Sequence, residues 1–438
     1  MMLLPLSLIL LTQQGSDPGR EFLLTQRDAI LLAPPEVACP SVSESLKWSS
    51  DGKQLAIRRS AVDMTSETIT AMLTGVDPKT AIKAQTEIVI WTAAAKTSRK
   101  VLSLDQRISQ LSSYDWLAGS SSLVAEVYSA SDRATEIWFV PNSGNSKKII
   151  SVPFDQGIEL VVSPTKPLAA IATYSREGTG QASVRFLDGT GKMTEWSLPP
   201  LTGLFQWSPD GSKLLMKSVN KSTTVSGAAL PAGWYAMNPQ TGSTERIETV
   251  TEATRTAETG LQAISTTANM PSNGAIGLVK APIVVLFEAP MDQKEPSYAI
   301  VGTDSSNGAV SPNGASVAYI SQGIAMVRAL VHVPKEAFLK AKAAALKAEI
   351  MNKGKQVGLA LQMFAADMDD AYPENKGWED KLMPYLGNRQ MIDGFNYTYA
   401  GGPLNGKDPS KTSLGFFSGP GGRANVYADG HVEWENNP

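Results

Sequence analysis

The sequence predicts a mainly β protein: a β-propeller of about six blades, followed by a small α+β domain that opens on one long helix. Two observations predict the propeller. An aromatic–turn–strand unit recurs along residues 41–333, and the spacing between copies suits a four-stranded blade. A third observation predicts the second domain, because after Pro334 the sequence changes to a long run with helical periodicity.

The clearest copy of the unit is residues 207–215, Trp-Ser-Pro-Asp-Gly-Ser-Lys-Leu-Leu. Pro209 fixes φ at the second position of a tight turn, Asp210 accepts hydrogen bonds inside the turn, and Gly211 takes the positive φ. The apolar residues that follow predict a buried strand. Further copies lie at residues 46–57, 114–125, 160–172 and 308–320, and the third of these is degenerate.

The aromatic or equivalent positions of the copies are 48, 116, 162, 207 and 310, so the separations are 68, 46, 45 and 103 residues. A four-stranded blade takes about 40–50 residues. The longest separation therefore fits two blades, and 68 residues fit one blade with a polar insertion near residues 60–85. A β-sandwich with coincidental turns is the alternative. We expect Trp48, Trp116 and Trp207 to pack between blades rather than to stack on sugars.

The N-terminus predicts export. Residues 1–15 contain an apolar core from Leu3 to Leu11, which is shorter than the roughly 20 residues of a membrane span and suits a signal peptide. A buried N-terminal strand is the alternative. Within the following segment, 16–40, residues 29–32 predict a strand that completes the last blade. No other run of this kind occurs, so we expect no further membrane span, and a periplasmic, cell-surface or extracellular location.

Composition and motifs argue against several functions. The net charge is −3, which gives no reason to expect nucleic-acid binding. The single cysteine, Cys39, excludes an intrachain disulfide and predicts a buried, inert thiol. With only two histidines, His332 and His431, both expected to be structural strand residues, a zinc site has no support. The chain lacks a Gly-x-Ser-x-Gly motif, a P-loop and a dinucleotide fingerprint, so we assign no catalytic or cofactor-binding residue.

Residues 334–438 form the predicted second domain. A helix is expected over residues 335–364, with an apolar face at Leu339, Ala343, Leu346, Ile350, Val357, Leu361 and Phe364 and with Gly354 in the gap. We expect this face to pack on its own domain and the six lysines to be solvated; a membrane-surface helix is the alternative. Near the end, Asp429-Gly430 predicts a hairpin turn between residues 425–428 and 431–434.

Both regions resemble known families. The repeated units resemble the WD40-like repeats of bacterial TolB-type propellers over roughly residues 41–331, which implies a protein-binding propeller whose partner is an envelope or secreted protein. About residues 345–436 resemble prepilin-like proteins of the His-X9-Asp-Gly type and, more distantly, major pseudopilins of type II secretion. The matching residues are 355–360, 363–367, 372–373, 378, 384–386 and 425–432.

This second resemblance has two departures. Gly419 stands where the first histidine of the motif belongs, and the processing site and hydrophobic half-helix of the family are missing. It therefore implies a pilin-like head used as a module. It also makes Asp429 a candidate calcium ligand; the alternative is that Asp429 is only a turn residue. Asp367, Asp369 and Asp370 are expected to be solvated at the helix end.

Together these observations predict an exported, non-enzymatic binding or scaffold protein. Its propeller recognises an envelope or secreted partner through loops at its mouth, with the pilin-like head as an accessory or assembly module. One alternative is a secreted carbohydrate- or peptide-active enzyme that uses acidic residues of the propeller channel. Another is a structural surface-layer component.

Overall fold

The computed structural model describes residues 22–63, 74, 83–175, 182–198, 205–218, 233–247, 260–271, 278–289 and 298–436. The predicted signal segment and most of the polar stretch near 60–85 lie outside these residues. The chain divides into two compact units, one comprising Ala29–His332 with the residues up to Thr25, the other comprising Val333–Pro438 with Gln26–Asp28. We describe each unit by itself.

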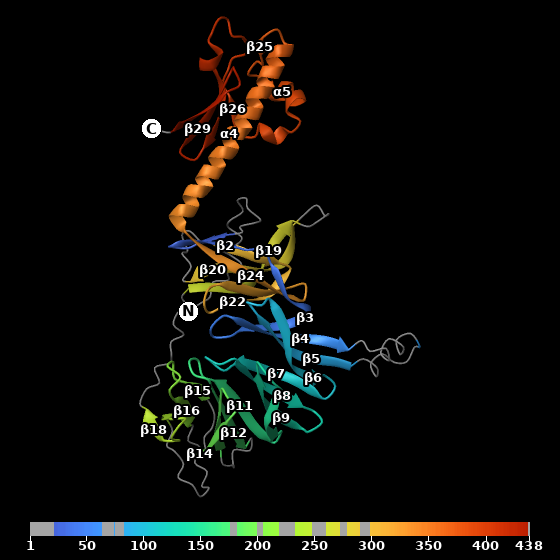
Figure 1. Ribbon diagram of the computed structural model, residues 1–438, viewed down its shortest axis with the longest axis vertical. Helices are drawn as coiled ribbons and strands as arrows, with labels where there is room; N and C mark the ends of the chain where they lie inside the picture. The colour runs from blue at the N-terminus through green and yellow to red at the C-terminus, as the bar shows by residue number, and fades with distance from the viewer. Residues whose placement is uncertain are drawn as a thin grey trace. The chain divides into compact units, whose positions relative to one another are not determined.

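Three sheets of the first unit are four-stranded antiparallel meanders that follow one another along the chain (Figure 1). Their strands are β7 (Ser109–Trp116), β8 (Ser122–Ser129), β9 (Ala134–Pro141) and β10 (Lys147–Pro153); β11 (Gln156–Val162), β12 (Leu168–Ser175), β13 (Ala182–Asp188) and β14 (Met193–Leu198); and β15 (Phe205–Trp207), β16 (Leu214–Ser218), β17 (Gly233–Met237) and β18 (Thr244–Ile247). Each predicted repeat in this part of the chain thus begins a sheet.

Among the remaining strands, those near the start of the unit pair with the last strand of the unit. The strands are β1 (Phe22–Leu24), β2 (Asp28–Leu32), β3 (Glu36–Trp48), β4 (Gln54–Asp63), β5 (Lys83–Thr92) and β6 (Thr97–Asp105), then β19 (Gly260–Pro271), β20 (Leu278–Ala289) and β21 (Ala299–Thr303), and finally β22 (Ser305–Val310), β23 (Ser316–Ser321) and β24 (Ile324–Pro334). β19–β21 form a three-stranded sheet, whereas β24 pairs with β23, β2 and β3. The strand predicted at residues 29–32 therefore completes the last sheet, as expected.

The apolar core of this unit lies between successive sheets. One buried cluster joins Ile88 of β5 to Leu123 of β8, and the next joins Phe139 of β9 to Ile171 of β12. Further clusters join the β11–β14 sheet to the β15–β18 sheet, the β19–β21 sheet to β22–β24, and β22–β24 to β3–β5. Sheets that pack face to face in chain order over most of the unit, with the last sheet packed against the first, form a β-propeller rather than a two-sheet sandwich.

The turn chemistry matches the sequence prediction. Gly211 has φ +65° and donates its N–H to the carbonyl of Ser208 at 2.8 Å. The Asp210 carboxylate accepts the Ser208 hydroxyl at 2.6 Å and the Ser212 hydroxyl at 2.7 Å. The repeat at Ser49 closes in the same way, with Gly52 at φ +69°.

The second unit is a helix packed on an antiparallel sheet. Its elements are α4 (Lys335–Asp367), β25 (Ala371–Tyr372), α5 (Trp378–Leu386), η1 (Arg389–Met391), β26 (Phe395–Tyr397), β27 (Gly402–Pro403), η2 (Pro409–Lys411), β28 (Ser413–Gly419), β29 (Gly422–Tyr427) and β30 (Val432–Asn436). The sheet order is β26-β28-β29-β30, and one buried cluster unites the sheet with α4 and α5. The predicted hairpin at Asp429-Gly430 joins β29 to β30.

The prediction for the long helix needs two corrections. α4 continues to Asp367, three residues past the predicted end. Its predicted apolar face is buried only from Ile350 onward, whereas Leu339 and Leu346 are 43% and 41% exposed and Ala343 is exposed. The predicted packing of this face on its own domain is therefore wrong for Leu339, Ala343 and Leu346, although the neighbouring Lys347 lies over the ring of Trp434 at 4.9 Å. In the described part of the chain, neither helix has the length and hydropathy needed to cross a bilayer.

Candidate functional site

The repeat tryptophans connect sheets. The indole Nε1 of Trp116 donates to the carbonyl of Lys47 at 2.9 Å, that of Trp48 to Ala309 at 3.0 Å, and that of Trp207 to Val161 at 3.1 Å. Each accepting residue directly precedes the repeat position of the neighbouring sheet: Lys47 precedes position 48, Val161 precedes 162 and Ala309 precedes 310. Trp116 and Trp207 are buried, so these rings are not available to stack on a sugar, and the predicted packing role is confirmed.

Two buried carboxylates are held inside single sheets. Glu87, whose side chain is 4% exposed, forms ion pairs with Arg59 at 2.6 Å and Lys100 at 3.0 Å. Burial alone would raise the pKa of Glu87, but the hydrogen bonds from Lys100 and Arg59 outweigh it and lower that pKa. Glu136 accepts Lys148 and the indole N–H of Trp138, each at 2.8 Å. Both carboxylates act as structural anions.

First strands of neighbouring sheets lie side by side: β3 contacts β22 and β7, and β11 contacts β15. They therefore line the axis of the propeller, where an enzyme would carry its acid pair. Glu44 on β3 pairs with Arg58 at 2.7 Å, and Asp115 on β7 pairs with Lys47 at 2.7 Å. Glu159 on β11 also has an interaction partner. The described carboxylates on these first strands are thus all engaged.

The residues predicted near the C-terminal turn lie at the surface. Asp429 accepts the backbone N–H of His431 at 3.1 Å and contacts its Nδ1 at 2.5 Å. His431 lies in the turn just before β30, not in a strand as predicted, and its ring stacks on Tyr427 with centroids 4.2 Å apart. Burial would raise the pKa of Asp429, but hydrogen bonds from His431 lower it.

Other predicted residues fall in structural roles. His332 lies on β24 as expected but is exposed, with Nε2 3.1 Å from the carbonyl of Gly314. Asp367, Asp369 and Asp370 are exposed at the end of α4, as predicted. Cys39 is fully buried, as predicted. Among the residues that the structure describes, no three His, Cys, Asp or Glu side chains gather as a metal site, and the calcium role of Asp429 stays a prediction.

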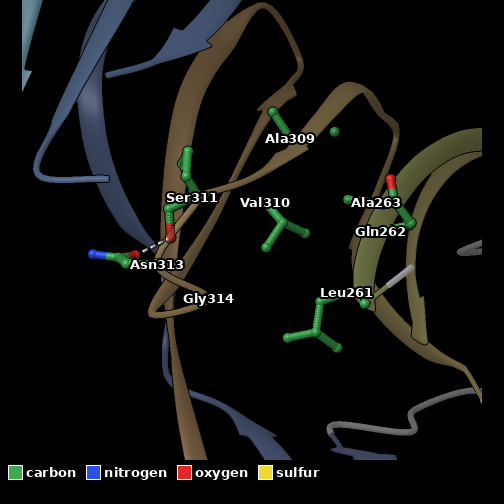
Figure 2. Close-up of a pocket in the computed structure, with 11 residues that line it drawn as sticks. Leu261, Gln262, Ala263, Ala309, Val310, Ser311, Asn313 and Gly314 are labelled. Atoms are coloured by element: carbon green, nitrogen blue, oxygen red, sulfur yellow. Dashed lines mark hydrogen bonds between the residues drawn. The ribbon is translucent and has the colours of Figure 1, made fainter. Parts of the chain in front are cut away.

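A cavity of about 620 Å³ lies between β19 and the end of β22. Figure 2 shows Leu261 and Val310 directed toward the same space, with Ser311 and Asn313 at its border. No lining side chain carries a charge. The Ser311 hydroxyl donates to Asn313 at 2.7 Å and accepts the N–H of Ser316, so it closes a turn and is not an activated nucleophile.

A partly exposed aromatic pair was missed by the sequence reasoning. The rings of Tyr128 and Phe154 stack with centroids 4.5 Å apart and planes 12° apart, and Tyr128 is 45% exposed. Ile108, 47% exposed, joins the same end of the sheet, because its carbonyl accepts the N–H of Ala130 at 2.8 Å. Tyr128 ends an apolar strand, and that placement was the only signal in the sequence.

No family model and no curated protein matches the chain. The chain is similar to several solved propellers, all at low identity. An oligogalacturonate lyase from Vibrio parahaemolyticus is 13% identical with a TM-score of 0.31, and 67% of each chain is covered. The β-propeller domain of the Trilobed protease from Pyrococcus furiosus is 10% identical with a TM-score of 0.32, covering 65% of this chain and 78% of that one.

A third similar structure is the Cps50 (Swd1) β-propeller domain from Myceliophteria thermophila, 13% identical with a TM-score of 0.33, covering 68% of this chain and all of that domain. At this level of similarity these structures leave the activity of this chain open. Its own sheets define the class: a protein with a unit of successive antiparallel sheets in a β-propeller arrangement and a second, α+β unit.

Proposed function

We propose that the chain is an exported, non-enzymatic binding scaffold. A six-bladed, TolB-like propeller recognises an envelope or secreted protein, and a prepilin-like C-terminal domain serves as an accessory or assembly module. We assign the blades to β3–β6, β7–β10, β11–β14, β15–β18, β19–β21, and β22–β24 with β2. The resemblances in the sequence support the family assignments, the apolar core from Leu3 to Leu11 supports the export, and the geometry supports the binding role.

The observation that carries the binding role is the asymmetry between the two ends of the sheets. First-to-second and third-to-fourth strands are joined by tight turns, such as the one between Trp48 and Gln54. The opposite end carries the longest links between second and third strands, from Asp63 to Lys83 and from Ser218 to Gly233. Long connections on a rigid scaffold favour recognition.

The exposed pair of Tyr128 and Phe154 lies at this same end, since Tyr128 is near the end of the second strand β8 and Phe154 follows the fourth strand β10. Exposed aromatic rings are enriched where proteins bind one another. A binding role also agrees with the engaged carboxylates of the first strands, which favour neither a general acid nor a nucleophile.

Site-specific photo-cross-linking tests this proposal. A photoreactive phenylalanine at position 128 of the full-length protein, illuminated in the native envelope, is expected to give one defined adduct. Met193, 36% exposed at the tight-turn end of the third sheet, is the matched control and is expected to give none. Equal labelling from both positions, or from neither, contradicts the proposal.

The enzyme alternative predicts a different result. Turnover of a glycan or peptide that is lost in Glu44→Gln and Asp115→Asn would make the first-strand carboxylates catalytic and would replace the scaffold proposal. Self-assembly of the pure protein into sheets would support the surface-layer alternative. The calcium proposal for Asp429 requires that CaCl2 raise the melting temperature of the protein and fail to do so in Asp429→Asn.

A further inference from the structure

The second unit carries an Asn-Gly pair in an exposed tight turn. Asn405 has φ +51° and Gly406 has φ +81°, and the N–H of Lys407 donates to the carbonyl of Leu404 at 3.1 Å. Two successive positive φ values closed by such a bond define a type I′ turn, for which Asn-Gly is a preferred pair. Both residues are exposed, and a Cβ added at Gly406 would meet no atom within 4 Å. The space around the pair is therefore open.

An asparagine that precedes glycine can modify itself. The backbone nitrogen of the glycine attacks the Cγ atom of the asparagine and gives up its proton to a base of the solvent, and the side-chain nitrogen takes up a proton and leaves as ammonia. Water then opens the resulting five-membered succinimide at either carbonyl, which gives aspartate or isoaspartate. Glycine favours the attack because it carries no side chain that would hinder its nitrogen. The net reaction consumes water and releases ammonia.

The bonding around Asn405 leaves both reacting groups unrestrained. Within the part of the chain that the structure describes, no residue forms a hydrogen bond with the side chain of Asn405 or with the N–H of Gly406. The electrophilic carbon and the attacking nitrogen therefore approach each other without first breaking a bond to the protein. Only the bond between Lys407 and Leu404 holds the turn.

A second Asn-Gly pair, at the end of β22, shows the opposite arrangement. The side-chain oxygen of Asn313 accepts the Ser311 hydroxyl at 2.7 Å and the N–H of Ala315 at 3.1 Å. Its side-chain nitrogen donates to the carbonyl of Asp51 at 3.2 Å. The N–H of Gly314 donates to the carbonyl of Ser311 at 2.8 Å. The same two residue types are thus held at both reacting groups, and these bonds must break before the reaction begins.

A third pair, Asn307-Gly308 on β22, is intermediate. The side-chain nitrogen of Asn307 donates to the carbonyl of Glu44 at 2.8 Å. A Cβ added at Gly308 would lie 2.5 Å from a methyl group of Val284, so this glycine is packed against the β19–β21 sheet. Bonding and packing therefore rank the three described pairs in reactivity, with Asn405 first, Asn307 second and Asn313 last.

We propose that Asn405-Gly406 is a site of spontaneous modification, at which the folded protein converts asparagine to aspartate and isoaspartate. The aspartate product adds a negative charge next to Lys407. The isoaspartate product adds one carbon atom to the main chain and so lengthens the turn that follows β27. This modification goes beyond the proposed binding function and does not depend on it.

The test follows the full-length protein over time in mildly alkaline buffer by peptide mass spectrometry, which detects the replacement of the side-chain amide by a carboxyl group. An isoaspartate-specific methyltransferase with a labelled methyl donor measures the isoaspartate product. We expect Asn405 to convert at least about tenfold faster than Asn313, equivalent to about 1.4 kcal/mol in the barrier, because hydrogen bonds restrain only Asn313. We expect the two rates to converge in urea, where these bonds are lost.

Two variants separate the chemistry from the fold. Asn405→Gln is expected to abolish the fast conversion, because the longer side chain would have to close a six-membered ring. Ser311→Ala removes one bond to Asn313. In this variant, shown to be folded by circular dichroism, we expect conversion of Asn313 to accelerate about fivefold while the rate at Asn405 stays unchanged.

Three results would overturn the proposal. The first is an equal rate at Asn405 and Asn313 in the folded protein, or a faster one at Asn313. The second is conversion of Asn405 in urea only, which would show that the turn protects the pair. The third is a difference between the two rates that persists in urea, which would make it a property of the neighbouring sequence and not of the hydrogen bonds.

Discussion

The repeat tryptophan differs from the other large apolar residues because its indole N–H can donate a hydrogen bond. The indoles of Trp48, Trp116 and Trp207 each satisfy a backbone carbonyl of the neighbouring sheet. Phenylalanine would keep an aromatic ring at the position, but it is smaller and would leave that carbonyl without its partner. The repeat therefore encodes packing and a directional link between sheets in one side chain.

The change Trp116→Phe isolates this link. We expect it to lower the free energy of unfolding of the propeller by about 1–3 kcal/mol, because a part-buried carbonyl loses its donor and the smaller ring packs less fully. Urea denaturation followed by circular dichroism measures the change. Trp434→Phe removes an exposed indole bond to Asn436 and serves as the control, with an expected loss of about 0.5 kcal/mol or less. Equal losses would show that the link between sheets adds no stability.

Two glycines of α4 test how closely the helix approaches the sheet. A Cβ on Gly358 would lie 3.0 Å from the backbone oxygen of Gly430, whereas a Cβ on Gly354 would meet methyl groups of Val432 at 3.1 and 3.3 Å. The Val432 side chain can change its rotamer to make room, whereas the backbone of the tight turn at Gly430 cannot move away. We expect Gly358→Ala to destabilise the second unit by about 1–3 kcal/mol despite the helix preference of alanine.

Gly354→Ala is expected to be clearly milder, and a thermal melt of each variant measures the difference. If both changes cost the same, the close approach of the turn does not decide the packing.

Among the elements, β2 joins residues near the N-terminus to the last sheet. Arg328 on β24 secures this strand. Its guanidinium donates to the carbonyls of Ala33 at 2.6 Å, Leu32 at 3.2 Å and Val301 at 3.1 Å. One side chain thus binds the N-terminal strand, the last sheet and the β19–β21 sheet together.

Arg328→Met keeps the length of the side chain and removes all three donors. We expect hydrogen exchange of the amides of β2 to accelerate by at least about tenfold, equivalent to 1.4 kcal/mol of local stability. Arg107→Met, which removes an exposed pair with Asp105, is the control and leaves β2 unchanged. Unchanged exchange in both variants would mean that the strand pairing alone holds β2.

α4 shows which features of an element could be predicted from the sequence and which could not. Its periodicity predicted the helix and, from Ile350 onward, the residues that are buried. The same periodicity could not show that the sheet ends before Leu346. An apolar stripe identifies the face of a helix that favours burial, but it does not show whether another element covers that face. The propeller strands were predictable because turn chemistry repeats with them.

The candidate site was less predictable than the fold. Tyr128 and Phe154 are 26 positions apart and meet only because two strands of one sheet end together. The ion pairs of Glu44 and Asp115 depend equally on pairing between strands and between sheets. No local sequence pattern predicts such contacts, because they depend on the register of paired strands and on the order of the sheets.

At the scale of the whole molecule, several of the described carboxylates accept hydrogen bonds that lower their pKa, and this sets the response to pH. Hydrogen bonds from Ser208 and Ser212 lower the pKa of Asp210 to about 2 from an ordinary 3.8, and the pKa values of Asp51 and Glu87 are lowered too. At the other extreme, burial raises the pKa of Tyr114 to about 12 from 10.0.

The signs of these shifts predict a broad plateau of stability. A lowered carboxyl pKa means that the unfolded chain binds more protons, so stability is full above about pH 4 and is lost as the pH falls toward 2. A raised tyrosine pKa stabilises below pH 10 and that contribution is lost as the pH rises toward 12. With only two histidines in the chain, we expect little change between pH 5 and 9.

Melting temperatures across this range measure the plateau, and Glu87→Gln tests its acid limb. This change leaves Arg59 and Lys100 without their shared anion, so we expect a loss of about 3 kcal/mol at pH 7. Because the pKa of Glu87 is lowered in the folded protein, we expect the loss to become smaller as the pH falls and Glu87 of the native protein takes up its proton. A loss that stays the same as the pH falls would show that the charge of Glu87 contributes nothing to the acid response.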